Sequence, residues 1–377
     1  MENNSRQYEL VVFGANGYTG RYTCEHIAEQ LPTDLKWAVA GRSEQKLQTL
    51  VGDLRALNSD RSQPGIEIAQ LDKNSLITLA KKTKVLVSTV GPFFRYGTAV
   101  VEACAESGTH YVDCTGESPW VLEMIRKYDQ IAKQNKAVLI PQCGVESAPA
   151  DILTYSLASH ARRTLSSGIS EIVYTIYDLK SKPSGGTLAT VLGLFDHYSP
   201  SQFRDSLHPG AADATIVNRS WGLLGSGEYY GPRFQFSPYM RARNILTGAL
   251  IHFALALGTL SLLLPPVRWA LKKMVFQPGE GVSKEVAKRE RIEYRAVATS
   301  DSSDPADPHR IEGRAAWEGG LYHLTGVLLA EAAIALLRDE TLAKKIGGGV
   351  LTPATLGGAY VERLQKAGMR IDVRVMP

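Results

Sequence analysis

The amino-acid sequence predicts an α/β protein with two parts: a doubly wound parallel sheet of the Rossmann type, and a second α+β domain whose sheet is mixed or antiparallel. Segments typical of strands and helices alternate over the first 150 residues, which indicates right-handed crossovers and a parallel sheet. The first strand-like run ends in a glycine-rich loop. Beyond Asp151 the strand-like segments lack crossover helices of this kind, so we expect them to form a separate sheet.

The glycine-rich loop has the spacing G-x-x-G-x-x-G and lies between the apolar run Val11-Val12-Phe13 and a helix-compatible stretch, 21–30. In such a strand–turn–helix the first glycine permits the sharp turn, the second lets the backbone approach a pyrophosphate, and the third lets the helix pack closely on the strand. Phosphates bind at the helix N-terminus, where free N–H groups and the dipole favour negative charge. We therefore predict a dinucleotide site that includes Gly14, Asn16, Gly17, Tyr18, Thr19 and Gly20. The alternative is a glycine-rich turn without a ligand.

The residues after the second strand-like run, 37–40, indicate which dinucleotide binds. An NAD site commonly has an acidic residue here for the ribose 2′-hydroxyl, whereas an arginine accommodates a 2′-phosphate. This chain has Arg42 and Ser43, with Lys46 one turn later, and its nearest acid, Glu44, falls after the turn. The sequence therefore predicts NADP(H) as the cofactor. The alternative is that Arg42 is an ordinary solvated base and that selectivity is loose.

The carboxyl ends of the other strands of the first domain should lie at the same edge of the sheet, where ligands of open parallel sheets bind. A helix is expected at 44–57, and the strand-like runs lie at 66–71, 84–90, 110–113 and 137–140. We expect the backbone at Val90, Gly91 and Pro92 to carry the nicotinamide ribose. Asp72 is expected either to meet the adenine edge or to cap the helix that follows it.

The second domain is expected to contain strands joined by turns and loops. Alternating strands are predicted at 169–179, 291–299 and 310–317, with a polar hairpin loop at 300–308 between the last two. A long helix is predicted at 326–338, and 370–375 reads as a final strand.

Composition sets limits on function. A chain of 377 residues is long enough for two domains, and a formal charge of +4 gives no electrostatic case for nucleic acid. The four cysteines lie far apart without a C-x-x-C pair, which argues against a zinc site or a disulfide scaffold. No signal peptide precedes the first strand, so we expect a reducing, cytoplasmic location.

Several motifs together resemble the saccharopine dehydrogenase-like oxidoreductases, a family that includes trans-acting enoyl reductases. They span most of the chain: 14–20, 40–43, 91–93 with 96–97, 108–113 with 116–117, 143–144 with 147–151, 184–187 and 348–354. The resemblance implies reductase chemistry on a nicotinamide cofactor. It also implies a split Rossmann domain, 1–150, to which a C-terminal segment at about 325–377 returns, with a mixed-sheet substrate domain, 151–324, inserted between them.

An apolar stretch at 245–264 has twenty residues without a charge, and His252 is its only ionisable side chain. Basic residues lie on both sides of it: Arg241, Arg243, Arg268, Lys272 and Lys273. Three arrangements stay open: a buried core helix that packs His252, a hairpin broken at Pro265-Pro266, or a helix lying in one leaflet of a membrane or on a lipid droplet.

No single proton donor is identifiable from the sequence. The catalytic candidates are Tyr96, Asp113 and Cys143, and three further residues fall near the same expected crevice: Glu117, Glu146 and Tyr322. Each also has an ordinary structural interpretation, as a packed aromatic ring, a buried thiol or a cap.

The sequence as a whole predicts an NADPH-dependent reductase of a conjugated C=C bond in a hydrophobic acyl or polyketide-like substrate. One alternative is reduction of an imine derived from an amino acid, for which Arg204, Arg219, Arg233, Arg241 and Arg243 offer bases. The other is a nucleotide-binding membrane or lipid-droplet protein without catalysis. A homodimer is left open.

Overall fold

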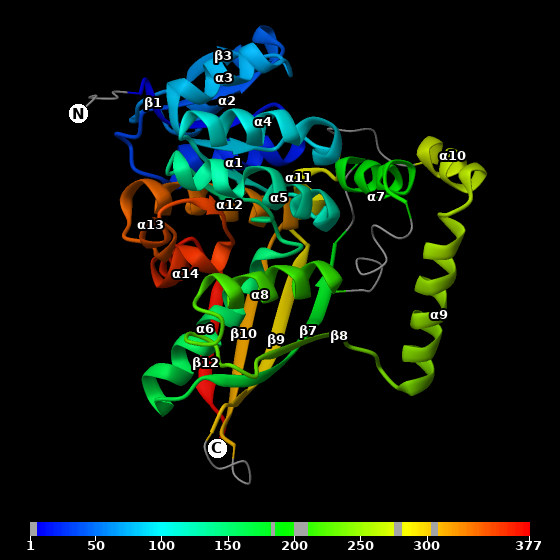
Figure 1. Ribbon diagram of the computed structural model, residues 1–377. Coiled ribbons are helices and arrows are strands. Elements are labelled where there is room, and N and C mark those ends of the chain that lie inside the picture. Colours follow the sequence, from blue (N-terminus) through cyan, green and yellow to red (C-terminus); the bar gives the residue numbers. More distant parts are fainter. Residues whose placement is uncertain (1–5, 182–184, 200–209, 275–280, 303–307) are drawn as a thin grey trace.

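Two β-sheets organise the chain, as Figure 1 shows for the computed structural model. The structure describes residues 6–181, 185–199, 210–274, 281–302 and 308–377. The first sheet has seven strands in the order β11-β6-β5-β4-β1-β2-β3, and every neighbouring pair is parallel. These strands are β1 (Tyr8–Phe13), β2 (Trp37–Gly41), β3 (Gly65–Ile68), β4 (Thr83–Ser88), β5 (His110–Asp113), β6 (Val138–Ile140) and β11 (Gly349–Val350). This is the predicted Rossmann-type sheet.

Helices cover both faces of this sheet because its strands are apolar on both sides. On one face, Leu10 and Val12 of β1 pack with α1 (Tyr18–Gln30), α2 (Glu44–Leu57) and α12 (Leu321–Arg338). On the other face, Val11 and Phe13 pack with three further helices. These are α3 (Lys73–Lys82), α4 (Phe93–Ser107) and α5 (Ser118–Gln134).

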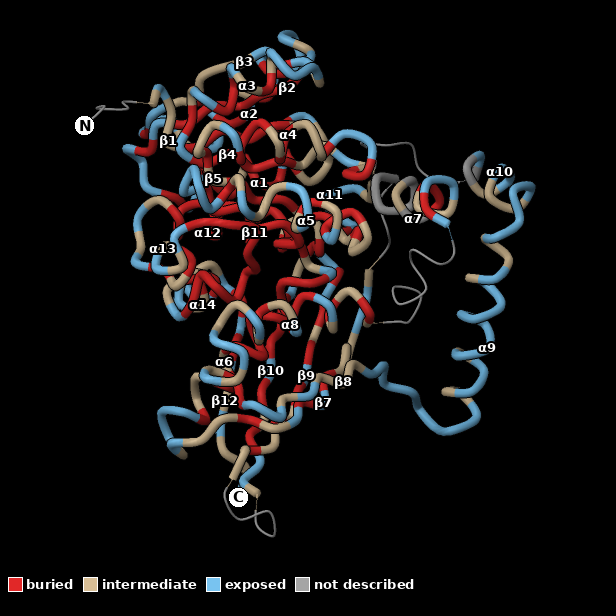
Figure 2. Tube along the Cα trace, viewed as in Figure 1, coloured by how far each residue is buried: buried red, intermediate tan, exposed pale blue. Residues whose placement is uncertain are grey.

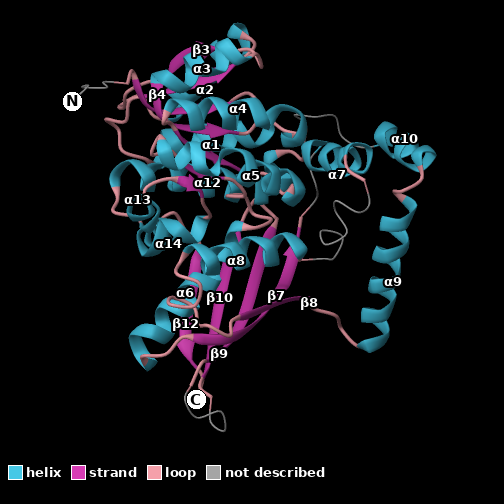
Figure 3. Ribbon diagram, in the orientation of Figure 1, coloured by secondary structure: helices cyan, strands magenta, loops and turns pink. Residues whose placement is uncertain are grey.

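The second sheet is mixed, in the order β12-β10-β9-β7-β8 (Figure 3). Its strands are β7 (Ile169–Lys180), β8 (Gln235–Met240), β9 (Arg291–Ser300), β10 (Arg310–Glu318) and β12 (Arg370–Val375). Only the β7–β8 pair is parallel. The helices α6 (Ala148–Leu165) and α8 (Ala211–Leu223) pack on one face, so the buried residues of β9 alternate with more exposed ones.

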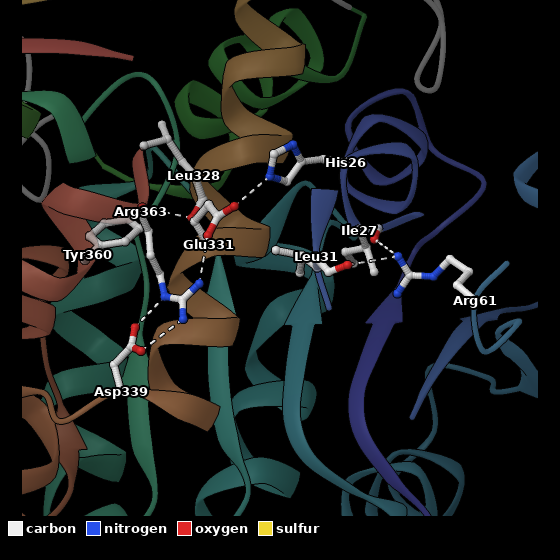
Figure 4. A network of polar contacts seen from close by, with 9 residues as sticks. All are labelled: His26, Ile27, Leu31, Arg61, Leu328, Glu331, Asp339, Tyr360 and Arg363. Carbon is white, nitrogen blue, oxygen red and sulfur yellow. Dashed lines mark hydrogen bonds and ion pairs between the residues drawn. The ribbon is translucent and has the colours of Figure 1, made fainter. Parts of the chain in front are cut away.

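The C-terminal segment returns to the first domain only in part. Helix α12 packs on α1, and β11 adds a strand beside β6, but β12 crosses to the second sheet and pairs with β10. Short helices lie between them: α13 (Leu342–Ile346), the 3₁₀ helix η2 (Pro353–Leu356) and α14 (Gly357–Lys366). Polar contacts tie this segment to α1 (Figure 4): His26 lies 2.8 Å from the Glu331 carboxylate, and Arg363 bridges Glu331 and Asp339.

Two strands of the structure have no counterpart among the predicted elements. Strand β8 contains Pro238, which favours an edge position, and β8 is indeed the edge of its sheet. Strand β11 follows a glycine run and is only two residues long. The long helix α12 begins at Leu321 rather than at the predicted Gly326. Within the motif at 184–187, Ser184 lies outside the described residues.

The apolar stretch forms a helix, α9 (Ile245–Ser261), that stands away from both domains (Figure 1). None of its residues is buried, and Figure 2 shows it mostly pale blue, with some intermediate residues in tan. A break precedes α10 (Pro265–Met274), and the pair is bent by 102°. The buried-core alternative, with a packed His252, is therefore wrong for this structure. The remaining elements of this region are α7 (Gly185–His197) and α11 (Lys284–Ala287).

Among the described residues, α12 alone has the length and hydropathy of a membrane span as a single helix, and it is mostly buried in the core. The bent pair α9–α10 meets the same criteria only when its two helices are taken together.

Candidate cofactor and catalytic site

The loop between β1 and α1 is shaped so that only glycine fits at two positions. Gly14 has φ +87°, a left-handed conformation that side chains disfavour. A Cβ at Gly20 would lie 2.2 Å from the Gly14 carbonyl oxygen, so the first turn of α1 can approach the loop only without a side chain there. Thr89, which sequence analysis missed, donates its hydroxyl to that same Gly14 carbonyl at 3.1 Å. The loop is therefore held in one shape before any ligand arrives.

The N-terminus of α1 presents free N–H groups above this loop. Gly17 is the N-cap and has no side chain to cap the helix. The first helical backbone bond runs from the Arg21 N–H to the Gly17 carbonyl, which leaves the N–H groups of Tyr18, Thr19 and Gly20 without that partner. Such a terminus stabilises a phosphate.

The Tyr18 side chain does not take part in phosphate binding. Its hydroxyl donates to the Val282 carbonyl at 2.8 Å, and its ring packs edge-on against Tyr322. Only the backbone of Tyr18 is available to a nucleotide. Tyr322, one of the catalytic candidates, is thus placed beside the start of α1.

The end of β2 carries the positive charge that was predicted for a 2′-phosphate. Arg42 and Lys46 are exposed, and Arg42 makes no hydrogen bond or ion pair with the described residues. The Asn16 amide lies close to Gly41, so the glycine loop and the end of β2 adjoin. Ser43 caps α2: its hydroxyl accepts the Lys46 N–H at 3.5 Å. An unpartnered guanidinium beside the helix N-terminus fits a phosphorylated ribose.

The buried Glu117 side chain holds the backbone of the segment after β4. Both carboxylate oxygens of Glu117 accept backbone N–H groups at the start of α4, from Phe93 at 2.9 Å and Phe94 at 2.6 Å. Gly91 is exposed directly ahead of them. Glu117 is fully buried and serves as a cap, so it holds the backbone at Val90, Gly91 and Pro92 rather than facing a substrate.

Asp72 caps α3, as one of the two interpretations expected. Its side chain is exposed and accepts the Ser75 N–H at 3.0 Å. Contact with an adenine stays a prediction.

The three catalytic candidates are not brought together. Asp113 is fully buried and accepts hydrogen bonds from the Tyr111 hydroxyl and from the N–H groups of Thr115 and Gln142. Burial raises its pKa to about 7, but its oxygens are already used inside the protein. Tyr96 is 40% exposed on α4 and contacts neither of the other two.

Cys143 is buried at the contact with α14. Its Sγ lies 3.3 Å from the Tyr360 hydroxyl, and burial raises the pKa of the thiol to about 12. A thiol that stays protonated in the core is a packing residue. Of the candidates, Asp113 and Cys143 are thus placed where they support the site from within.

Glu146 is placed differently, at the junction of the two domains. Its side chain is exposed. A Cβ added at Gly116 would lie only 2.4 Å from the Glu146 Oε2, so the carboxylate needs a glycine there. The surrounding protein nevertheless raises its pKa by desolvation. Sequence analysis missed its neighbour from the second domain, Asp213 of α8, and Tyr174 of β7, which lies near Asp213. Both are distant from Glu146 in sequence, and no motif marks them.

Comparison with known proteins agrees with this geometry. Residues 10–140 match the saccharopine dehydrogenase NADP binding domain. A Mycobacterium tuberculosis protein, named provisionally as a trans-acting enoyl reductase, is 30% identical over 97% of this chain and 97% of its own. The chain belongs to the saccharopine dehydrogenase-like oxidoreductases. A trans-acting enoyl reductase of Mycobacterium ulcerans is 29% identical over 99% of both chains.

A solved amine dehydrogenase from Mycobacterium smegmatis covers 94% of this chain and 97% of its own at 12% identity, with a TM-score of 0.44. That TM-score is too low to support a shared function. The match to the NADP binding domain and to enoyl reductases shows that this saccharopine dehydrogenase-like chain is an NADP-dependent oxidoreductase.

Proposed function

We propose that this oxidoreductase reduces the C=C bond of an enoyl group in a hydrophobic acyl substrate, with NADPH as the hydride donor. The proposal rests on the glycine loop at Gly14–Gly20 and on Arg42, which has no partner within the described part of the chain; both fit the cofactor. The names of the relatives at 28–30% identity support the enoyl group.

The domain junction supports a substrate without carboxylates. Tyr174 and Tyr294 stack there with ring centroids 5.8 Å apart, and Glu146 and Asp213 add acidic groups. An imine formed from an amino acid would need basic clamps at this place. Three of the described bases already contact other groups: Arg219 donates to the Val350 carbonyl, Arg233 pairs with Asp301, and Arg241 packs on the Tyr177 ring. Arg204 lies outside the described residues. The imine alternative therefore has weaker support.

Bound NADPH would supply a hydride, and this chain's residues would position the acceptor. The N-terminus of α1 and Arg42 would hold the phosphates. Glu117 would fix the backbone at Gly91 beneath the nicotinamide end by capping α4. The aromatic rings of Tyr174 and Tyr294 would face the acyl chain and exclude water.

The test is NADPH consumption by the purified chain with two substrate panels, enoyl thioesters of increasing chain length and cyclic imines. We expect turnover with the thioesters and a higher kcat/KM for longer chains, since each buried methylene adds about 0.8 kcal/mol. Turnover with the imines alone would contradict the proposal. Binding of NADPH without consumption would instead favour a nucleotide-binding protein without catalysis.

We also propose that the α9–α10 pair binds to one leaflet of a membrane or to a lipid droplet. Large apolar side chains of α9 are exposed, among them Ile245 at 93% and Leu250 at 70%. Patches of this kind mark interaction sites. Exposed bases flank α9, Arg241 and Arg243 before it and Lys273 after it, and they complement anionic headgroups.

A 17-residue helix is about 25 Å long, short of the roughly 30 Å of a hydrocarbon core. Both ends of α9 also connect to the same body, through β8 and through α10. Binding to one leaflet therefore suits α9 better than spanning the bilayer. It would also place the enzyme beside hydrophobic substrates in the membrane.

A further inference from the structure

We infer that Glu146, which lies near Asp213 and Tyr294 of the second domain, is the general acid that protonates the substrate carbon next to the carbonyl. The inference rests on the proposed function. It names the acid that the sequence alone leaves open.

The first argument is placement. Glu146 follows β6, and its carboxylate lies over Gly116 in the loop after β5, at the carboxyl edge of the Rossmann sheet where ligands bind. A side chain at position 116 would fill the space that the Glu146 oxygen occupies. Glu146 is exposed, unlike Asp113 and Glu117 in the same loops. Of these three carboxyls in the loops after β5 and β6, Glu146 is therefore the one that a substrate can reach.

The second argument is preorganisation. The Val145 N–H donates to the Thr325 hydroxyl of α12 at 3.3 Å, and the Val145 carbonyl accepts the Tyr294 hydroxyl of β9 at 3.0 Å. The residue before Glu146 is thus held from the first domain and from the second. A general acid must be fixed relative to the reacting atom, and this anchoring provides it.

Several polar groups near Glu146 have no hydrogen-bond partner among the described residues. Asp213 is only 8% exposed and makes no hydrogen bond with the described residues. The Tyr174 hydroxyl, on a side chain 2% exposed, also has none. In the loop that carries Glu146, the buried Gln142 Nε2 and Ser147 Oγ lack partners as well. Buried polar groups are normally paired, so the unpaired Gln142 and Ser147 atoms beside Glu146, with Asp213 nearby, leave hydrogen-bonding capacity for a bound molecule.

Electrostatics favours a site that retains a proton near neutral pH. Burial and the Glu146 charge raise the pKa of Asp213 to about 8, and desolvation raises that of Glu146. The other titratable groups that face the pair are Cys114, Tyr174 and Tyr294, and each is neutral at this pH because burial raises its pKa. The retained proton near neutral pH is on Asp213, beside Glu146, so Asp213 can serve as the proton reserve from which Glu146 is recharged.

Reduction breaks the C=C π bond and forms two C–H bonds, one from the hydride that NADPH supplies and one from a proton. Glu146 gives its proton to the carbon beside the carbonyl and is left as a carboxylate. Water then returns a proton to Glu146, with Asp213 as its neighbour.

The experiment compares Glu146→Gln with Glu171→Gln, an exposed carboxyl on β7 without partners among the described residues. We expect Glu146→Gln to lower kcat about 10²- to 10⁴-fold with enoyl thioesters, as loss of a general acid does. Its affinity for NADPH, measured by fluorescence, should stay within twofold of the wild type. Glu171→Gln should keep the wild-type kcat.

A second readout needs no turnover. Infrared difference spectra of the free protein should show a carboxyl that titrates above the usual range of glutamate, disappears in Glu146→Gln, and titrates at a lower pH in Asp213→Asn. An unchanged kcat in Glu146→Gln, or a Glu146 that titrates in the usual range and ignores Asp213→Asn, would overturn the inference. Inactivity of the wild type with every thioester would instead contradict the proposed function itself.

Discussion

At the scale of single residues, the account depends most on Arg42. Because its guanidinium has no partner among the described residues, its loss should act on the bound nucleotide rather than on the fold. A hydrogen bond to a charged group contributes about 1.5–3 kcal/mol, so we expect Arg42→Ala to weaken NADPH binding about 10- to 100-fold. NADH, which lacks the 2′-phosphate, should lose less than about twofold by the same reasoning.

The matched control for Arg42→Ala is Arg55→Ala, an exposed arginine in the last turn of α2. Fluorescence titration with both reduced cofactors measures all four affinities. Equal losses of NADPH and NADH affinity in Arg42→Ala would remove the case for 2′-phosphate recognition.

Gly20 tests whether the loop is shaped by close contact. Its Cβ would lie 2.2 Å from the Gly14 carbonyl, so Gly20→Ala should cost about 1–3 kcal/mol of unfolding free energy, as overpacking does, and should weaken NADPH binding. Gly52, in the interior of α2, has open space around its Cβ position, so Gly52→Ala should raise stability by about 0.5–1 kcal/mol. Urea denaturation distinguishes the two; equal effects would show that contact at Gly20 is not limiting.

At the scale of elements, α9 gives the clearest prediction. We expect the wild type to float with vesicles of anionic phospholipid in a density gradient, and the double variant Phe253→Asp, Leu257→Asp to stay at the bottom, because each buried charge opposes insertion. Leu122→Asp, at an exposed apolar position on α5, is the matched control and should float.

Another outcome would point to a different role. If the wild type does not bind vesicles but sediments as a dimer, and the double variant sediments as a monomer, then α9 forms the contact between two copies of the chain. The flotation experiment and sedimentation thus separate the two occupants of this surface.

Elements also show how far the sequence reaches. The glycine loop and β4 are predictable because local physics determines them: a left-handed turn in the loop and a continuous apolar run in the strand. The sheet that β12 joins is not predictable in this way, because tertiary packing decides that β12 pairs with β10 and not with a strand of the first sheet. The exposure of α9 could not be predicted either, because the sequence pattern of an apolar helix is the same whether the helix lies in a core or on a surface.

The candidate site divides in the same way. Residues of the cofactor cradle lie close together in sequence, so their spacing predicts them. The group around Glu146 comes from three distant segments, and Asp213 and Tyr174 have no motif of their own. A carboxyl that caps a helix, such as Glu117, cannot be told from one that faces a substrate until the fold shows its partners.

At the scale of the whole molecule, buried carboxyl groups couple stability to pH. Asp151, in the first turn of α6, is buried against α8 and η2, where it accepts a hydrogen bond from the Ser220 hydroxyl at 2.6 Å and from the Ala354 N–H at 2.7 Å. Burial raises its pKa to about 7. Between its unfolded pKa near 3.9 and this value the folded chain binds the extra proton, so the contribution of Asp151 to stability is present at low pH and is lost as pH rises through about 7.

Asp151→Asn should abolish this part of the pH dependence. The variant should be less stable by about 1–3 kcal/mol at pH 5, since one of its amide N–H groups would face another donor, and this deficit should shrink by pH 8. Urea denaturation at the two pH values measures it, with the exposed Asp53→Asn as control. A deficit that is constant or grows with pH would contradict the assignment.

The central claim is that this fold binds NADPH at its first loop and delivers its hydride to an enoyl carbon. The most direct measurement uses NADPH deuterated at C4 of the nicotinamide, in ordinary water, with mass spectrometry of the thioester product. The account predicts a saturated product with one deuterium on the carbon distant from the carbonyl and a solvent hydrogen on the carbon beside it. A product reduced at the carbonyl, or bound NADPH that keeps its deuterium with every thioester, would contradict it.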